Sequence, residues 1–87
     1  MFYVYVLKSS KNGDIYIGRT DDLRKRLKYH NSGLARATKP NRPWKLIYYE
    51  AYKSKKDAIL RERQLKNHRA KLDLRDQLKY SLDLELA

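Results

Sequence analysis

Residues 2–19 read FYVYVLKSSKNGDIYIGR, two runs rich in β-branched and aromatic residues on either side of Asn12-Gly13. An Asn-Gly pair between two such runs is the strongest short signal for a β-hairpin. We therefore predict one strand over 2–8, a two-residue turn, and a returning strand over 14–19.

The predicted turn sets the register of this hairpin, with Leu7 opposite Gly18. Because side chains alternate across a strand, the two faces of the hairpin differ in character. One face carries tyrosines and a glycine (Tyr3, Tyr5, Tyr16, Gly18), and the other is apolar (Phe2, Val4, Val6, Ile15, Ile17). A glycine in a strand lets another group approach the backbone closely. The apolar face is the expected core face, and the tyrosine face is the candidate functional one.

A helix and a third strand are predicted to follow. Thr20 is a suitable N-cap, and Gly33 is a suitable stop for the first helix. The segment 33–43 reads as a basic loop, and 44–52, WKLIYYEAY, reads as the third strand.

The remainder of the chain is predicted to be helical. Ser54 and Asp57 form a capping-box arrangement at the start of a helix that runs to about His68. A shorter helix is predicted over 70–80. The order is β-β-α-β-α-α, an α+β fold with a small three-stranded antiparallel sheet flanked by helices.

The 87 residues suffice for a single domain, 1–87, with its core over about 2–70 and a C-terminal helix and tail over about 70–87. The net charge is +11, which points to an anionic partner such as nucleic acid. An anionic membrane surface is the rival partner, but no apolar run is long enough to span a bilayer, so we expect no membrane association. The chain has no cysteine and its first residues do not resemble a signal peptide, so we expect a cytoplasmic protein.

Three polar residues fall on helix faces that should point inward. At about 100° per residue, Arg26 and His30 share a narrow stripe with Leu23 and Leu27. Glu62 lies among apolar residues of the second helix (Ala58, Leu65, Leu72), where a carboxylate is costly unless a cation or donors meet it.

Each of these residues also has a structural interpretation. Tyr16 taken alone is a packed strand tyrosine, and Arg26 alone is a solvated arginine. His30 could place a cation at a helix C-terminus, and Glu62 could form a salt bridge with Arg26. Four such exceptions in one small domain favour a shared functional site.

Together these residues resemble the GIY-YIG nuclease superfamily. Tyr3-Val4-Tyr5 stands where the family has Gly-Ile-Tyr, and Tyr16-Ile17-Gly18 is the second motif intact. Arg26 and His30 follow Gly18 by eight and twelve positions, and Glu62 occupies the family's glutamate position on a later helix. Within the superfamily, the chain resembles small stand-alone proteins related to the N-terminal domain of the excinuclease C subunit.

The resemblance implies an endonuclease that hydrolyses DNA with one divalent cation, Mg²⁺ or Mn²⁺, held by Glu62. It implies that Tyr16 acts as general base and that Tyr5 positions the attacking water. Arg26 would clamp a phosphate oxygen, and His30 would aid Tyr16 or the phosphate. A role in DNA repair or recombination is expected.

The expected phosphate contacts are polar and basic residues of the central loop and of the C-terminal part (Arg36, Thr38, Lys39, Arg42, Lys66, Arg69, Lys71). Contacts of this kind position the chain without reading bases, so we expect weak sequence preference. The expected partner is DNA, including branched or structured forms, with RNA as an alternative. A module of the same fold that binds DNA or structured RNA without cleaving it is the alternative function.

Overall fold

The computed structural model describes residues 1–67 and 78, which form one sheet and two α-helices. The elements are β1 (Phe2–Ser9), β2 (Ile15–Thr20), α1 (Leu23–Ser32), a short 3-10 helix (Lys39–Asn41), β3 (Trp44–Tyr52) and α2 (Lys55–Leu65). The sheet is antiparallel with strand order β2-β1-β3. The predicted α+β class and element order are confirmed over these residues. The predicted helix over 70–80 and the tail lie outside the described part of the chain, except for residue 78.

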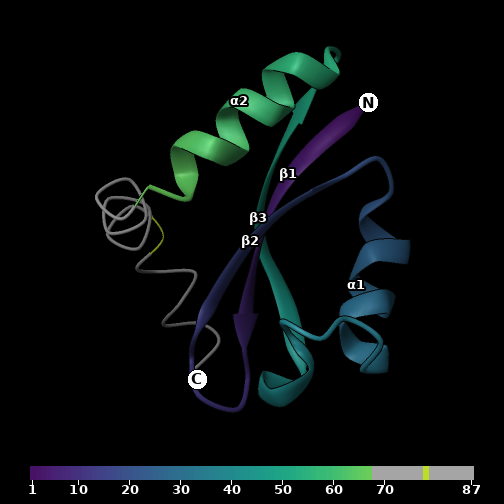
Figure 1. The fold of residues 1–87 in the computed structure, drawn as a ribbon, viewed down its shortest axis with the longest axis vertical. Helices are drawn as coiled ribbons and strands as arrows, with labels where there is room; N and C mark the ends of the chain where they lie inside the picture. The colour runs from purple at the N-terminus through teal and green to yellow at the C-terminus, as the bar shows by residue number, and fades with distance from the viewer. Residues whose placement is uncertain (68–77, 79–87) are drawn as a thin grey trace.

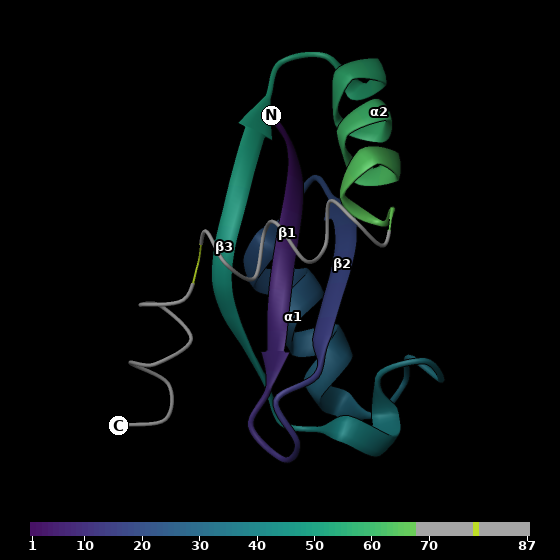
Figure 2. The same cartoon turned by 90° about the vertical axis from the view of Figure 1, so that its left-hand side faces the viewer.

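The two helices lie on opposite sides of the sheet, α2 on one face and α1 on the other (Figure 1). Seen face-on, β1 runs between β2 and β3, with α2 in front and α1 behind (Figure 2). On the α2 side, the core consists of apolar residues from the strands and the helix (Val4, Val6, Ile17, Ala58, Leu65). On the α1 side, Tyr5, Leu7 and Trp44 form a second core cluster.

The hairpin register differs from the predicted one by two residues. Leu7 pairs with Tyr16, and Tyr5 pairs with Gly18, so the predicted pairing of Leu7 with Gly18 is wrong. A slip of one residue turns every side chain to the opposite face, whereas a slip of two restores it. The tyrosine face and the apolar face are therefore as predicted.

Ser9 explains why the turn is longer than two residues. Its backbone N–H donates to the carbonyl of Asp14 at 2.8 Å, which closes a loop of residues 10–13. Its hydroxyl accepts from the backbone N–H groups of Lys11 and Asn12, at 3.1 and 3.2 Å, and donates to the carbonyl of Asn41 at 2.6 Å. A side chain that satisfies loop amides stabilises the wider turn.

The start of α1 differs from the prediction by two residues. Asp22, not Thr20, is the N-cap, and its carboxylate accepts from the backbone N–H of Lys25 at 3.0 Å. Thr20 is buried, and its hydroxyl accepts from the backbone N–H of Asp22 at 3.1 Å, a turn that carries the chain from β2 into the helix. Gly33 ends α1 as predicted, with φ of 86°.

The start and the end of α2 both differ from the prediction. Ser54 is its N-cap residue, but its side chain makes no capping hydrogen bond. The helix ends at Leu65, before the predicted end at about His68. No helix among the described residues is both long and apolar enough to cross a membrane.

Candidate active site

Tyr5 and His30 form the buried centre of the candidate site. The Tyr5 hydroxyl lies 2.8 Å from Nε2 of His30, and both residues are almost fully buried. Burial raises the pKa of Tyr5, and the neighbouring Tyr16 adds to this effect. Burial and the charge of Arg26 both lower the pKa of His30. The pair therefore consists of a neutral phenol and a neutral imidazole at neutral pH.

Thr38 lies on the other side of the imidazole. Its hydroxyl lies 2.8 Å from Nδ1 of His30 and 3.4 Å from the carbonyl of Ala35. In the tautomer with its proton on Nδ1, His30 donates to Thr38 and accepts from Tyr5 at Nε2, and the other tautomer reverses both hydrogen bonds. Trp44 donates its indole N–H to the Thr38 carbonyl at 2.8 Å, which holds Thr38 in place beside His30.

This arrangement places one predicted site residue elsewhere than expected. Thr38 is fully buried, so it does not lie on the surface where a phosphate contact was predicted. His30 is 2% exposed, which confirms its predicted place on the inward stripe of α1, and both of its ring nitrogens lie within hydrogen-bond distance of protein hydroxyls.

Tyr16 lies beside this buried pair but is only half-buried. Its ring centroid is 4.9 Å from that of His30 and 6.4 Å from that of Tyr5. Gly18, its neighbour on the same strand face, has no open space above it. The Tyr5 phenol fills the place that a side chain at residue 18 would take, so the predicted notch admits Tyr5.

Glu62 projects from α2, on the other side of the sheet. Its carboxylate is half-buried and lies 3.6 Å from Nε of Arg19 and 3.4 Å from Nζ of Lys66. The structural alternative for Glu62 was a salt bridge with Arg26, but Arg19 is the arginine that faces it. Nε of Arg19 is buried and makes no hydrogen bond with the described residues.

Arg19 is the site residue that the sequence interpretation missed. It continues the alternating set of Ile15 and Ile17 on the face predicted to be apolar. A cation as the third member of an apolar strand face breaks the pattern in the same way as Glu62 does on α2. That shared exception was a usable signal that the two residues meet.

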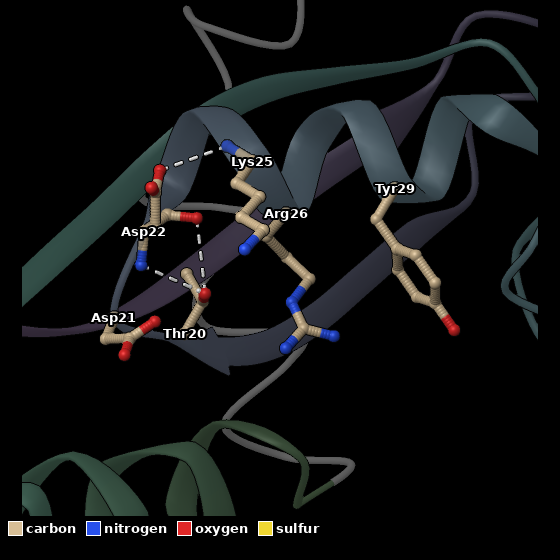
Figure 3. A pocket seen from close by; sticks show the side chains of 6 residues that line it. All are labelled: Thr20, Asp21, Asp22, Lys25, Arg26 and Tyr29. Atoms are coloured by element: carbon tan, nitrogen blue, oxygen red, sulfur yellow. Dashed lines mark hydrogen bonds between the residues drawn. The ribbon is translucent and has the colours of Figure 1, made fainter.

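Arg26 is exposed, which differs from its predicted place on the inward stripe of α1. Its guanidinium carbon lies 5.4 Å from the ring centroid of Tyr29, a cation–π distance. Arg26 and Tyr29 project from the same side of α1 into a hollow of about 300 Å³ (Figure 3). A second hollow, of about 230 Å³, is lined by both Arg26 and Arg19.

The sheet thus separates the phenols from the carboxylate, and the end of β2 brings them into electrostatic contact. After burial and Tyr16, the next influences on the pKa of Tyr5 are Arg26, which lowers it, and Glu62, which raises it. Residues from β2, α1 and α2 therefore act on one phenol. The site has acid–base groups, exposed guanidinium donors and one carboxylate.

Apart from the buried Thr38, the predicted phosphate-binding residues divide into three groups. Arg36, Lys39 and Arg42 are exposed on the loop between α1 and β3. Lys66 is exposed and close to Glu62. Arg69 and Lys71 lie outside the described residues.

Among the described residues, the carboxylate of Glu62 is the group that would hold a divalent cation. The described residues contain no group of three or more His, Asp or Glu side chains that could hold a metal ion. Mg²⁺ is commonly bound through one or two carboxylates, substrate phosphates and several waters. A single half-buried carboxylate, whose oxygens make no tight hydrogen bond to residues 1–67, suits that mode.

The family model described as "GIY-YIG catalytic domain" matches residues 1–75. A UPF0213 protein of Bacillus pumilus is 45% identical over 74 residues, which cover 83% of this chain and 74% of that protein. A UPF0213 protein of Clostridium perfringens is 43% identical over 67 residues, 76% of this chain and 71% of that protein. The solution NMR structure of a UPF0213 protein from Bacillus halodurans has a TM-score of 0.58 and 35% identity, covering 100% of this chain and 98% of that one.

Proposed function

Because the chain belongs to the GIY-YIG nuclease family, we propose that it is a divalent-metal-dependent endonuclease that hydrolyses DNA phosphodiester bonds. The observation that carries this proposal is the convergence on Tyr5. Tyr16 and His30 lie against it, and Arg26 and Glu62 both act on its pKa from other elements.

Tyr16 is the better general base of the two tyrosines. Burial raises the pKa of Tyr5, and its hydroxyl is hydrogen-bonded to His30, so Tyr5 keeps its proton and is not the group that takes one from water. Tyr16 is half-buried, with its ring centroid 6.4 Å from that of Tyr5, and can be reached by solvent. The phenolate form of Tyr16 would take the proton of the attacking water and become a neutral phenol, while Tyr5 accepts the water's second hydrogen bond.

Two guanidinium groups are placed to hold the phosphate. Arg26 is exposed, carries a fork of donors, and lines the same hollow as Arg19. A guanidinium matches two phosphate oxygens and stabilises the charge that develops on them. Arg19 is the second guanidinium group; its Nε is buried, makes no hydrogen bond with the described residues and lies 3.6 Å from the Glu62 carboxylate.

Glu62 would hold the divalent cation. Such an ion, when bound, polarises the phosphate and neutralises charge on its oxygens. The carboxylate sits between Arg19 and Lys66, whose positive charges offset its negative charge when no metal is bound.

The exposed cations of the loop between α1 and β3 support DNA as the substrate. Arg36, Lys39 and Arg42 would contact backbone phosphates, which are the same in every sequence. We therefore propose weak sequence preference and a role in DNA repair or recombination.

The proposal is tested with purified protein on single-stranded, duplex and branched DNA and on RNA, with and without Mn²⁺. Wild-type protein should cleave DNA only with the metal, and Glu62→Gln should lose cleavage but retain binding. Asp57→Asn is the matched control, since it removes an exposed carboxylate from the same helix. Metal-independent cleavage, or full activity of Glu62→Gln, would contradict the proposal.

One observation favours the alternative of a binding module that does not cleave. The Glu62 carboxylate already has two cationic neighbours, so the helix needs no metal to compensate its charge. DNA binding without cleavage of any tested DNA, with or without Mn²⁺, would support this alternative. A clear preference for structured RNA would identify the nucleic acid it binds.

A further inference from the structure

We propose that Glu50 and Arg61 form a positioning pair that sets the orientation of α2 and thereby holds Glu62 in the site. The inference rests on the proposed function, because Glu62 matters only if the site acts on phosphate. Arg61 donates from Nε to one carboxylate oxygen of Glu50 at 2.8 Å and from a terminal nitrogen to the other at 3.1 Å. This two-pronged contact fixes direction as well as distance.

Glu50 is itself held by its own strand. Tyr48 and Tyr52, two residues before and after it, lie on the same face of β3 and donate their hydroxyls to its two oxygens. Burial alone would favour the protonated acid, but the hydrogen bonds from Arg61, Tyr48 and Tyr52 lower the pKa of Glu50 to about 2. The carboxylate is a fixed, charged anchor on β3.

The orientation of α2 depends on such an anchor because its apolar contacts are few. Only Ala58 and Leu65 are fully buried among the residues of the helix, and alanine offers little shape to hold a helix against a sheet. The core contacts therefore fix the height of α2 above the sheet better than its rotation about its own axis.

Arg61 and Glu62 are consecutive, and their side chains leave the helix about 100° apart. Arg61 reaches Glu50 on β3, while Glu62 faces Arg19 on β2. The two contacts tie α2 to the two outer strands of the sheet. A rotation of about 20° would move a side-chain tip about 2 Å, given a helix radius with side chains of about 5–6 Å.

The test compares Glu50→Gln and Arg61→Met with wild type. Both should raise the Mn²⁺ concentration needed for half-maximal cleavage by about 10–100-fold, the cost typical of losing an outer-shell contact. Binding of Mn²⁺ to the protein without nucleic acid, followed by electron paramagnetic resonance, should weaken in parallel. Arg63→Met is the matched control, since it removes an exposed arginine from the same helix and should leave both values unchanged.

A purely stabilising role predicts something different: lower melting temperatures with an unchanged Mn²⁺ requirement in the folded protein. That result would overturn the proposal. If Arg61→Met does not fold, Arg61→Lys, which keeps the charge and loses the fork, should still raise the Mn²⁺ requirement. Wild-type values in Arg61→Lys and Glu50→Gln would contradict it.

The positioning pair and the proposed function fail in distinguishable ways. If wild-type protein neither binds Mn²⁺ nor cleaves, the proposed function fails. The NMR signal of the Arg19 Nε–H then tests whether Glu50 and Arg61 hold Glu62 beside Arg19. That signal should shift in Glu50→Gln because Glu62 moves away from Arg19. An unshifted signal in the folded variant would overturn the positioning pair alone.

Discussion

The phenol of Tyr5 occupies the space in which a side chain at Gly18 would stand. The two residues are direct partners in the β1–β2 ladder, so the first tyrosine motif and the glycine of the second interlock across the hairpin. The glycine is thus required by another protein side chain. It allows the Tyr5 hydroxyl to pass over β2 and reach His30.

Gly18→Ala should displace Tyr5 and break its contact with His30. The nearest atoms to the added methyl are the hydroxyl and ring of Tyr5, which are packed and have little room to retreat. Overpacking of this kind costs about 1–3 kcal/mol, so chemical denaturation should show a lower free energy of unfolding. Tyr5→Phe is the comparison, because it removes the hydrogen bond without adding volume. A Gly18→Ala protein as stable and as active as wild type would contradict the interlock.

Tyr16→Phe should abolish most metal-dependent cleavage and leave folding and nucleic-acid binding intact. The variant removes only the hydroxyl of a half-buried ring whose packing against His30 is retained. Positioned acid–base groups contribute about 10²–10⁴-fold, and the cleavage rate should fall within that range. Cleavage of supercoiled plasmid measures the effect, and a gel-shift assay checks binding. An unchanged rate would exclude Tyr16 as the general base.

Acid should destabilise the fold through Glu50. Its pKa is lowered to about 2 in the fold from an ordinary value of 4.5, so its contribution is fully present above pH 4.5 and is lost as the pH falls toward 2. This difference between the two pKa values of Glu50 corresponds to about 3 kcal/mol in the free energy of unfolding. Denaturation of wild type and Glu50→Gln should show a stability gap at pH 7 that narrows below pH 4.5. A gap that stays constant with pH would show that ionisation of Glu50 contributes nothing.

Neutralising the exposed cations of the loop should weaken nucleic-acid binding and reduce its salt dependence. Replacing Arg36, Lys39 and Arg42 by Gln removes up to three phosphate contacts, and each contact contributes about 0.9 to the slope of log K against log salt for duplex DNA. The slope should fall by about 2 to 3. A triple variant with the same charge change at exposed positions near or on α2 (Lys53, Lys56, Arg63 to Gln) is the control. Equal slopes in the two triple variants would mean that the loop has no special part in binding.

Local sequence signals were sufficient for the hairpin and the strands but not for their exact pairing. The Asn12-Gly13 pair predicted the hairpin correctly, and residues 44–52 form β3 with the predicted bounds. The register was wrong because Ser9 hydrogen-bonds to Asn41, far along the chain, and this contact widens the loop. A turn signal describes only adjacent residues and cannot include such a partner.

The candidate site was predictable as a set of residues but not as an arrangement. Periodicity alone assigned Arg26 to the interior, whereas the helix presents it to solvent beside Tyr29. Thr38 was assigned to the surface because it lies in a basic loop, yet it is buried against His30. Both errors arise because the path of a loop or helix over the sheet depends on tertiary contacts that a local pattern does not contain.

β2 is an outer strand of the three-stranded sheet, and the candidate site lies along it. Unpaired backbone groups at such an edge invite a strand from a second molecule, the first step toward aggregation. Here Arg19 lies one residue before the end of the strand, Arg26 lines the same hollow, and the whole chain carries a charge of +11. Two copies approaching edge to edge would repel each other. The positive charge of this edge therefore opposes strand pairing between two copies of the chain.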